Sequence, residues 1–268
     1  MAIQERSAVS SAAANGKHGH SLISDEKFHQ LYTLALDLHF SAEQGAASRA
    51  EEDGALAGVA AGLLAGDVLV SEHAVSLSEL GMGISGVRVM PPTSEGVIDA
   101  LSAAVADRMR RTQRVTTIFA SERASGPLLD AARTVASGAR LPVIFVEQAN
   151  ECASSSRRVK TKAAEDELIS IPVDAHDVIA VYRVAHESIM RARQGNGPTR
   201  IVCLSLSSPS NGSQTRRNDA VAKLEEWLIA RDLPVGEWRQ EIMAKREDRN
   251  RHEWKENSNR EKIPQTAA

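Results

Sequence analysis

Two largely apolar runs separated by one amphipathic segment constrain the fold of this chain more than any other feature. Residues 115–119 (VTTIF) and 141–146 (LPVIFV) lack the polar alternation of a half-exposed strand. The apolar side chains between them recur at helical spacing: Leu128, Leu129, Ala132, Val135 and Ala136. Strand, helix and strand in this order predict a right-handed crossover in a parallel sheet that is covered on both faces.

This β-α-β unit also indicates where a ligand would bind. In an open parallel sheet, ligands lie beyond the carboxyl ends of the strands. Here those ends are residues 120–122 (ASE) and 147–152 (EQANEC). We therefore expect part of any functional site to lie in these two segments.

The composition sets limits on the class of protein. The chain has 268 residues, of which 42% are hydrophobic and 25% charged, as in a large soluble α/β domain. Its net charge of −3 gives no reason to expect nucleic acid as a partner. The apolar runs are too short for a membrane span. With only two cysteines, Cys152 and Cys203, we expect no disulfide framework and a cytoplasmic location.

The rest of the chain alternates further helices and strands. Expected helices begin near residues 24, 51, 93, 177, 218 and 234, several of them at capping Ser, Thr, Asp or Asn side chains. Short apolar strands are expected at 68–70, 169–173 and 199–206. The predicted class is α/β, with a mostly parallel open sheet flanked by helices and a helical C-terminal arm. The expected division is a disordered tail over 1–23, one domain over 24–250 and a charged tail over 251–268.

The helix that begins near residue 93 shows a broad apolar pattern. Its expected buried face consists of Val97, Ile98, Leu101, Ala104, Val105 and Met109. Just before it, residues 81–86 spell G-x-G-x-x-G. That fingerprint must follow a strand and open a helix, whereas here residues 87–92 end in two prolines. We therefore interpret residues 81–86 as a glycine loop, not a dinucleotide site.

Several motifs, in order along the chain, are similar to those of a known family. The clearest is 173–182 (VDAHDVIAVY), which continues through 191–193 (RAR) to 197–199 (GPT). Further matches are residues 66–68 (GDV), 141–146 (LPVIFV) and the leucine-bearing stretch 220–232. Over residues 24–250 the chain resembles a divergent and shortened E1 α subunit of the thiamine-diphosphate-dependent 2-oxo acid dehydrogenases of the pyruvate, branched-chain and acetoin type.

This resemblance implies a thiamine-diphosphate-binding type of fold and a known chemistry. In the family, thiamine diphosphate and Mg²⁺ sit at an interface between α and β subunits. The cofactor decarboxylates a 2-oxo acid, and the acyl group passes to lipoamide. The implied partners are an E1 β-like subunit or a second copy of the chain. Because the family assembles as α2β2, the Ala- and Gly-rich helix that includes residues 54–64 is a candidate subunit interface.

At the positions where the family binds its metal, this chain differs. The family's G-D-G turn falls on residues 120–122, so Ser121 replaces the ligating aspartate and Glu122 follows it. Asn150 is kept at the position of the ligating asparagine. By resemblance, Ser121, Glu122 and Asn150 are remnant cofactor-binding positions, and Asn150 with the backbone carbonyl of Cys152 are remnant metal ligands. A neutral hydroxyl is a poor substitute for the anionic oxygen that Mg²⁺ requires.

Two other family positions have also changed. The family's H-R-x-H becomes residues 73–76 (HAVS), so its diphosphate-binding arginine is Ala74. The later loop, which in the family carries a histidine, has none in residues 207–215. These changes remove positive or metal-mediated charge that would face a diphosphate.

Three hypotheses follow for the function. In the first, the chain keeps the E1 α framework with a degenerate cofactor site, has no catalytic residue of its own, and acts as a partner or scaffold subunit. In the second, it is a working α subunit of a 2-oxo acid dehydrogenase, in which Asn150 and Glu122 hold the metal. In the third, a different enzyme uses Ser121 or Cys152 on the same fold. The lost ligands favour the first.

Overall fold

Six parallel strands form one sheet in a computed structural model that describes residues 23–43, 50–71, 86–120, 126–150, 168–205 and 219–260. The strands are β1 (Val68–Val70), β2 (Arg88–Met90), β3 (Thr116–Ala120), β4 (Val143–Asn150), β5 (Ile169–Asp174) and β6 (Thr199–Ser205). Their order across the sheet is β2-β1-β3-β4-β6-β5. Every described pairing is parallel, which confirms the predicted α/β class.

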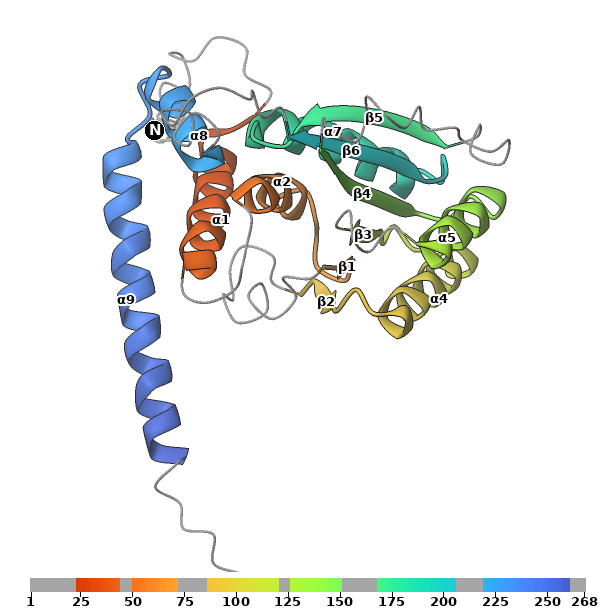
Figure 1. Ribbon diagram of the computed structural model, residues 1–268, viewed down its shortest axis with the longest axis horizontal. Helices are drawn as coiled ribbons and strands as arrows, with labels where there is room; N and C mark the ends of the chain where they lie inside the picture. The colour runs from red at the N-terminus through yellow and green to blue at the C-terminus, as the bar shows by residue number, and fades with distance from the viewer. Residues whose placement is uncertain are drawn as a thin grey trace, which may run out of the picture.

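Helices cover both faces of this sheet (Figure 1). They are α1 (Asp25–Glu43), α2 (Ala50–Ala60), α4 (Ser94–Arg110), α5 (Pro127–Gly138), α7 (Val178–Arg193), α8 (Ala220–Ile229) and α9 (Val235–Arg260). Helices α4 and α5 pack on one face, while α7 lies on the other with α1, α2 and α8 behind it.

The predicted β-α-β unit is present as β3, α5 and β4. Ile144 and Phe145 are both fully buried, although neighbouring side chains of a strand point to opposite faces. Ile144 belongs to the core beside α7, and Phe145 to the core beside α4 and α5. Burial on both faces explains why these strands lack polar alternation.

Helix α4 presents a different face to the sheet from the one expected. Thr93 caps it as predicted, accepting a hydrogen bond from the Gly96 N–H at 3.1 Å. The buried side chains, however, include those of Val97, Ala100 and Ala104. Three members of the expected buried face are exposed instead: Ile98, Val105 and Met109, with 51%, 38% and 79% of their surface accessible. The prediction was wrong here because alanines let the helix approach the sheet more closely than larger side chains would.

The expected apolar face of α5 is mostly confirmed. Leu129, Ala132 and Ala136 are buried, but Val135 is 52% exposed. Its place toward the sheet is taken by Arg133, whose side chain is only 10% exposed because it pairs with a buried glutamate. Helical spacing alone therefore wrongly included Val135 in the buried face of α5.

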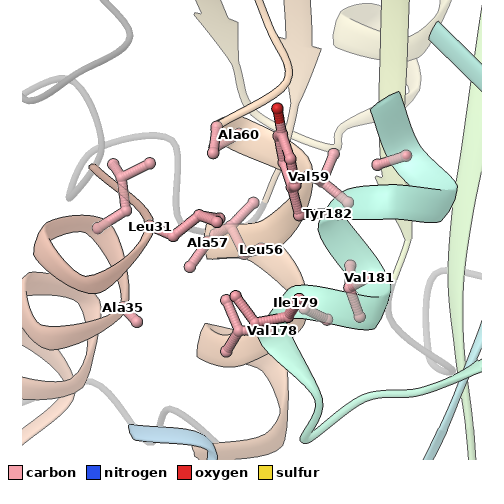
Figure 2. Close-up of a cluster of buried hydrophobic side chains, with 14 of the residues drawn as sticks. Leu31, Ala35, Leu56, Ala57, Val59, Ala60, Val178, Ile179, Val181 and Tyr182 are labelled. Carbon is pink, nitrogen blue, oxygen red and sulfur yellow. The ribbon is translucent and has the colours of Figure 1, made fainter. Parts of the chain in front are cut away.

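Helix α2 packs directly against α7 inside the core (Figure 2). Its residues 55–57, 59 and 60 are essentially inaccessible to solvent. A Cβ atom on Gly58 would lie 2.9 Å from the Val178 carbonyl oxygen and 2.9 Å from Val181 Cβ. The glycines thus permit close helix packing within one chain. The expectation that this helix is a subunit interface rather than core is wrong.

Helix α9 forms the predicted C-terminal arm and extends away from the sheet (Figure 1). Val235 and Ile242 are buried, and the side chains of Arg246 and Arg249 lie 3.6 Å and 3.3 Å from Oδ1 of the buried Asp37 on α1. The helix continues to Arg260, so the predicted domain boundary at 250 falls inside it. Over the described residues, no helix combines the length and apolar character needed to cross a membrane.

Candidate functional site

The carboxyl edge of the sheet is the candidate site, because ligands of open α/β sheets bind where the strand order reverses. The connection after β1 leads to β2, whereas the connection after β3 leads in the opposite direction to β4. The switch point therefore lies between β1 and β3. Residues 72–85 and 121–125, which follow these two strands, lie outside the described residues.

Two of the four predicted site residues, Ser121 and Glu122, fall in those segments. Ser121, Glu122 and Cys152 lie outside the described residues, so their roles stay predictions. Asn150 is the last residue of β4, and its Cα is in register with that of Ser205 on β6. Its backbone thus ends at the carboxyl edge, as the sequence predicted. Its side chain lies outside the described part.

A buried carboxylate that the sequence analysis did not single out stands close to this edge. Glu147 on β4 is in register with Ala120, the last residue of β3. Its Oε1 accepts a hydrogen bond from Nε of Arg133 at 2.9 Å, and its Oε2 accepts two from Arg200, at 3.0 Å and 2.8 Å. The Glu147 side chain is 8% exposed. Both of its oxygens are therefore used by arginines.

A second carboxylate, Asp174, ends β5 at the same edge of the sheet. Its Oδ2 accepts a hydrogen bond from Lys223 Nζ at 2.7 Å, and its Oδ1 accepts one from the backbone N–H of His176 at 3.0 Å. The His176 ring Nδ1 lies 3.3 Å from the same oxygen. Burial raises the pKa of Asp174, but these hydrogen bonds and the positive charge of Lys223 outweigh burial and leave the pKa below its ordinary value.

Cys203 lies behind this cluster on β6 and is fully buried. Burial, together with the nearby negative charge of Asp174, raises the pKa of its thiol to about 12. A thiol with so high a pKa stays neutral and is a poor nucleophile or metal ligand. Cys203 is therefore a small apolar core residue, as its mid-strand position indicated.

These carboxylates do not form a magnesium site. Magnesium requires several oxygen ligands in near-octahedral geometry, including at least one carboxylate. Across the described ranges, no group of three or more His, Cys, Asp or Glu side chains could hold a metal ion. Glu147 and Asp174, the carboxylates of the described strand ends, are both held by basic side chains. Ser121, Glu122, Cys152 and the side chain of Asn150 lie outside the described residues, so the expected loss of the metal site stays a prediction.

At the amino edge, two of the quoted sequence motifs contact each other directly. Asp67 follows the turn before β1, and its side chain is fully buried. Its carboxylate accepts hydrogen bonds from Arg193 Nη1 at 3.1 Å and from Arg193 Nη2 at 2.6 Å. It also accepts hydrogen bonds from the backbone N–H groups of Leu64 at 2.8 Å and Val115 at 2.9 Å. This network joins the start of the sheet to the end of α7. In the sequence, Asp67 is recognisable only as an aspartate that follows a turn glycine. This pattern does not indicate that Arg193 is its partner.

Comparison with known proteins shows which families the chain is similar to. A model described as "Dehydrogenase E1 component" matches residues 80–205. The α subunit of acetoin:2,6-dichlorophenolindophenol oxidoreductase from Bacillus subtilis is 29% identical over 143 residues, which cover 50% of this chain and 41% of that protein. The α subunit of the pyruvate dehydrogenase E1 component from Porphyra purpurea is 34% identical over 119 residues, which cover 39% of this chain and 32% of that protein.

Among solved structures, the chain is similar to transketolase from Campylobacter jejuni. The match covers 75% of this chain and 40% of the transketolase chain, with 13% sequence identity and a TM-score of 0.46. Because this TM-score is below 0.5, the structural similarity carries no argument, and the family assignment rests on the sequence matches. The matched segments span less than half the length of the two relatives. These matches support the assignment of the chain as a partial and divergent member of the dehydrogenase E1 component family, of the α-subunit type.

Proposed function

We propose that this chain is an E1 α-like subunit that does not hold thiamine diphosphate through Mg²⁺ and that acts as a non-catalytic partner or scaffold in an E1-type assembly. One observation carries the proposal. Ser121 follows the last residue of β3, at the position where the family has the aspartate that binds the metal.

The expected loss of cofactor affinity is large. A charge-assisted hydrogen bond contributes about 1.5–3 kcal/mol. Ser121 replaces a metal ligand and Ala74 replaces an arginine that binds the diphosphate. In addition, the buried Glu147 and the Asp174 carboxylate are held by basic side chains. Losing the metal and the arginine together would remove most of the affinity for a diphosphate.

The framework, in contrast, is kept. The segments that resemble the family most closely form β4, α7 and the start of β6. Asp67 and Arg193, which belong to two of these motifs, hold the sheet and α7 together. A retained scaffold with an altered ligand site is typical of a subunit that is selected for assembly rather than for chemistry.

A second candidate function is that of a working α subunit of a 2-oxo acid dehydrogenase. Asn150 at the end of β4 favours it, because the family's ligating asparagine occupies this position. It would require Glu122 to take the place of the missing aspartate. The relatives named above, which are subunits of acetoin and pyruvate dehydrogenating enzymes, indicate the class of substrate for this candidate.

A reconstitution experiment distinguishes the two candidates. The purified chain is mixed with an E1 β-like subunit from the same genome, and assembly is followed by sedimentation velocity with and without thiamine diphosphate and Mg²⁺. Lipoamide reduction driven by pyruvate, acetoin and branched-chain 2-oxo acids is measured in parallel. We expect a complex whose formation does not depend on the cofactor and which shows no turnover. Turnover that is abolished by Asn150→Ala would contradict the proposal and establish the working subunit.

A further inference from the structure

Four arginines surround one loop at the amino edge of the sheet, opposite the candidate cofactor edge. The loop, residues 194–198, connects α7 to β6. It lines a pocket of about 560 Å³, together with Arg108 and Arg111 from the end of α4. Residues 196–198 of the loop line a second pocket of about 500 Å³, together with Arg140 and Arg191.

Two glycines of the loop bring these arginines close to its backbone. Gly195 and Gly197 have φ angles of +79° and +86°, which L side chains rarely adopt. A Cβ atom on Gly195 would lie 3.0 Å from Nη1 of Arg108, and one on Gly197 would lie 3.8 Å from the side chain of Arg140. An arginine thus lies against each of these two glycines.

The charge of this region is not balanced by the protein. Among the residues that the structure describes, no acidic side chain lines either pocket. Within the described residues, Arg108, Arg111, Arg140 and Arg191 take part in no ion pair or side-chain hydrogen bond. Arg193, which also lines the larger pocket, is neutralised by Asp67. Asp107 on α4 is nearby in sequence but is buried and accepts a hydrogen bond from Thr112.

Helix ends account for only part of this positive charge. Helices α4, α5 and α7 all end at this edge, and arginines at helix C-termini are common because each end carries roughly half a negative charge. Three such ends offset about one and a half charges. Four guanidinium groups, less these helix ends and the formal charge of Asp107, leave a surplus of about one and a half positive charges for an external anion.

We propose that this arginine cradle (Arg108, Arg111, Arg140 and Arg191) binds a small oligophosphate anion, either free or carried by a nucleotide. Guanidinium groups match phosphate oxygens with paired, charge-assisted hydrogen bonds. Two basic pockets lined by consecutive residues of one loop suit an anion with several phosphoryl groups better than a single phosphate. The site lies at the edge opposite to that of the family's cofactor and is independent of the function proposed above.

The test is titration calorimetry at low ionic strength with tripolyphosphate, ATP and inorganic phosphate. We compare the unmodified chain with two double variants, Arg108→Gln with Arg111→Gln and Arg140→Gln with Arg191→Gln. Arg183→Gln is the matched control, because Arg183 is an exposed arginine on α7 that lines neither pocket. Glutamine keeps the length and polarity of the side chain. Circular dichroism and urea unfolding confirm that each variant folds.

We expect one tripolyphosphate or ATP per chain, bound more tightly than inorganic phosphate. Each double variant should bind at least about tenfold more weakly, while Arg183→Gln binds as the unmodified chain does. Tighter binding of ATP than of tripolyphosphate would identify a nucleotide as the source of the phosphates. Binding that all three variants weaken equally would overturn the proposal, as would no heat with any ligand at millimolar concentration. In the latter case the arginines serve only the helix ends, and their replacement lowers stability alone.

Discussion

Asp67 and Arg193, which are 126 residues apart in the sequence, form a two-point ion pair whose carboxylate is entirely buried. The Arg193 Nη1 group also donates to the backbone carbonyl of Gln113 at 2.5 Å, so it bridges three segments of the chain. This pair joins β1, the segment before β3 and the last turn of α7. It thus links two of the quoted sequence motifs to the packing of α7 on the sheet.

Arg193→Met tests the contribution of this pair. The variant leaves the Asp67 carboxylate buried without a cation, and breaking a buried pair in this way costs about 3–5 kcal/mol. Urea unfolding followed by circular dichroism measures the loss. The control is Arg183→Met on the same helix, an exposed position where the change should stay within about 0.5 kcal/mol. Equal stability of the two variants would show that the pair contributes nothing.

The Glu147 network makes a different prediction. Glu147→Gln removes the carboxylate that Arg133 and Arg200 share and leaves Arg133 only the exposed Asp130, and we expect a loss of about 3–5 kcal/mol in the free energy of unfolding. Replacing all three residues by methionine removes every buried charge of the network, and such replacements are often nearly neutral. The triple variant should therefore be clearly more stable than the single one in urea. A triple variant as unstable as Glu147→Gln would contradict this account.

Close packing of α2 on α7 predicts that Gly58→Ala is destabilising. The added methyl group would meet the Val178 carbonyl oxygen and Val181 Cβ, each at 2.9 Å. Overpacking of this kind costs about 1–3 kcal/mol. Gly236→Ala is the matched control, because nothing lies within 4 Å of a Cβ at Gly236 in α9. Alanine there should leave the thermal midpoint unchanged or raise it. An unchanged midpoint for Gly58→Ala would show that α2 can shift without cost.

Asp174 should make stability depend on pH in the acid range. Burial raises its pKa, but the hydrogen bonds from Lys223 and the His176 backbone outweigh this and hold the pKa below the ordinary value. A carboxyl group with a lowered folded pKa contributes stability above its unfolded pKa of about 3.9 and loses it as the pH falls through the folded pKa. Because Lys223 is 42% exposed, the contribution should be about 1 kcal/mol or less.

The measurement for Asp174 is urea unfolding of the unmodified chain and of Asp174→Asn at several pH values. The difference in unfolding free energy should be constant above about pH 5 and shrink toward zero below about pH 3. High salt should reduce it, since the lysine is partly screened. A difference that grows as the pH falls would have the wrong sign and would rule out this role for Asp174.

Much of the fold could be predicted from the sequence where burial is unambiguous. The runs at 115–119 and 141–146 lack polar alternation because β3 and β4 are covered on both faces. Capping side chains marked the starts of helices in the same way, as with Asp177, which accepts the Ala180 N–H at 2.9 Å. These local signals do not depend on distant parts of the chain.

Other features could not be predicted because they depend on distant contacts. Helix α4 has two apolar stripes, and only the sheet decides that Ala100 and Ala104 face inward while Ile98 and Met109 stay exposed. The strand β2 was missed because it has three residues, none of them fully buried. At the site, the position of Asn150 at the end of β4 was predictable from strand order, whereas the commitment of Glu147 to two arginines was not.

The central claim is that the chain keeps the E1 α framework but lacks the metal-dependent diphosphate site. Titration calorimetry with thiamine diphosphate, with and without Mg²⁺, tests it most directly, using the chain alone and together with an E1 β-like subunit. We predict no magnesium-dependent heat under either condition. Binding that is independent of magnesium and weakened by Arg108→Gln with Arg111→Gln would belong to the arginine cradle and leave the claim intact. Micromolar binding that requires Mg²⁺ would contradict it and point to Glu122 and Asn150 as the metal ligands.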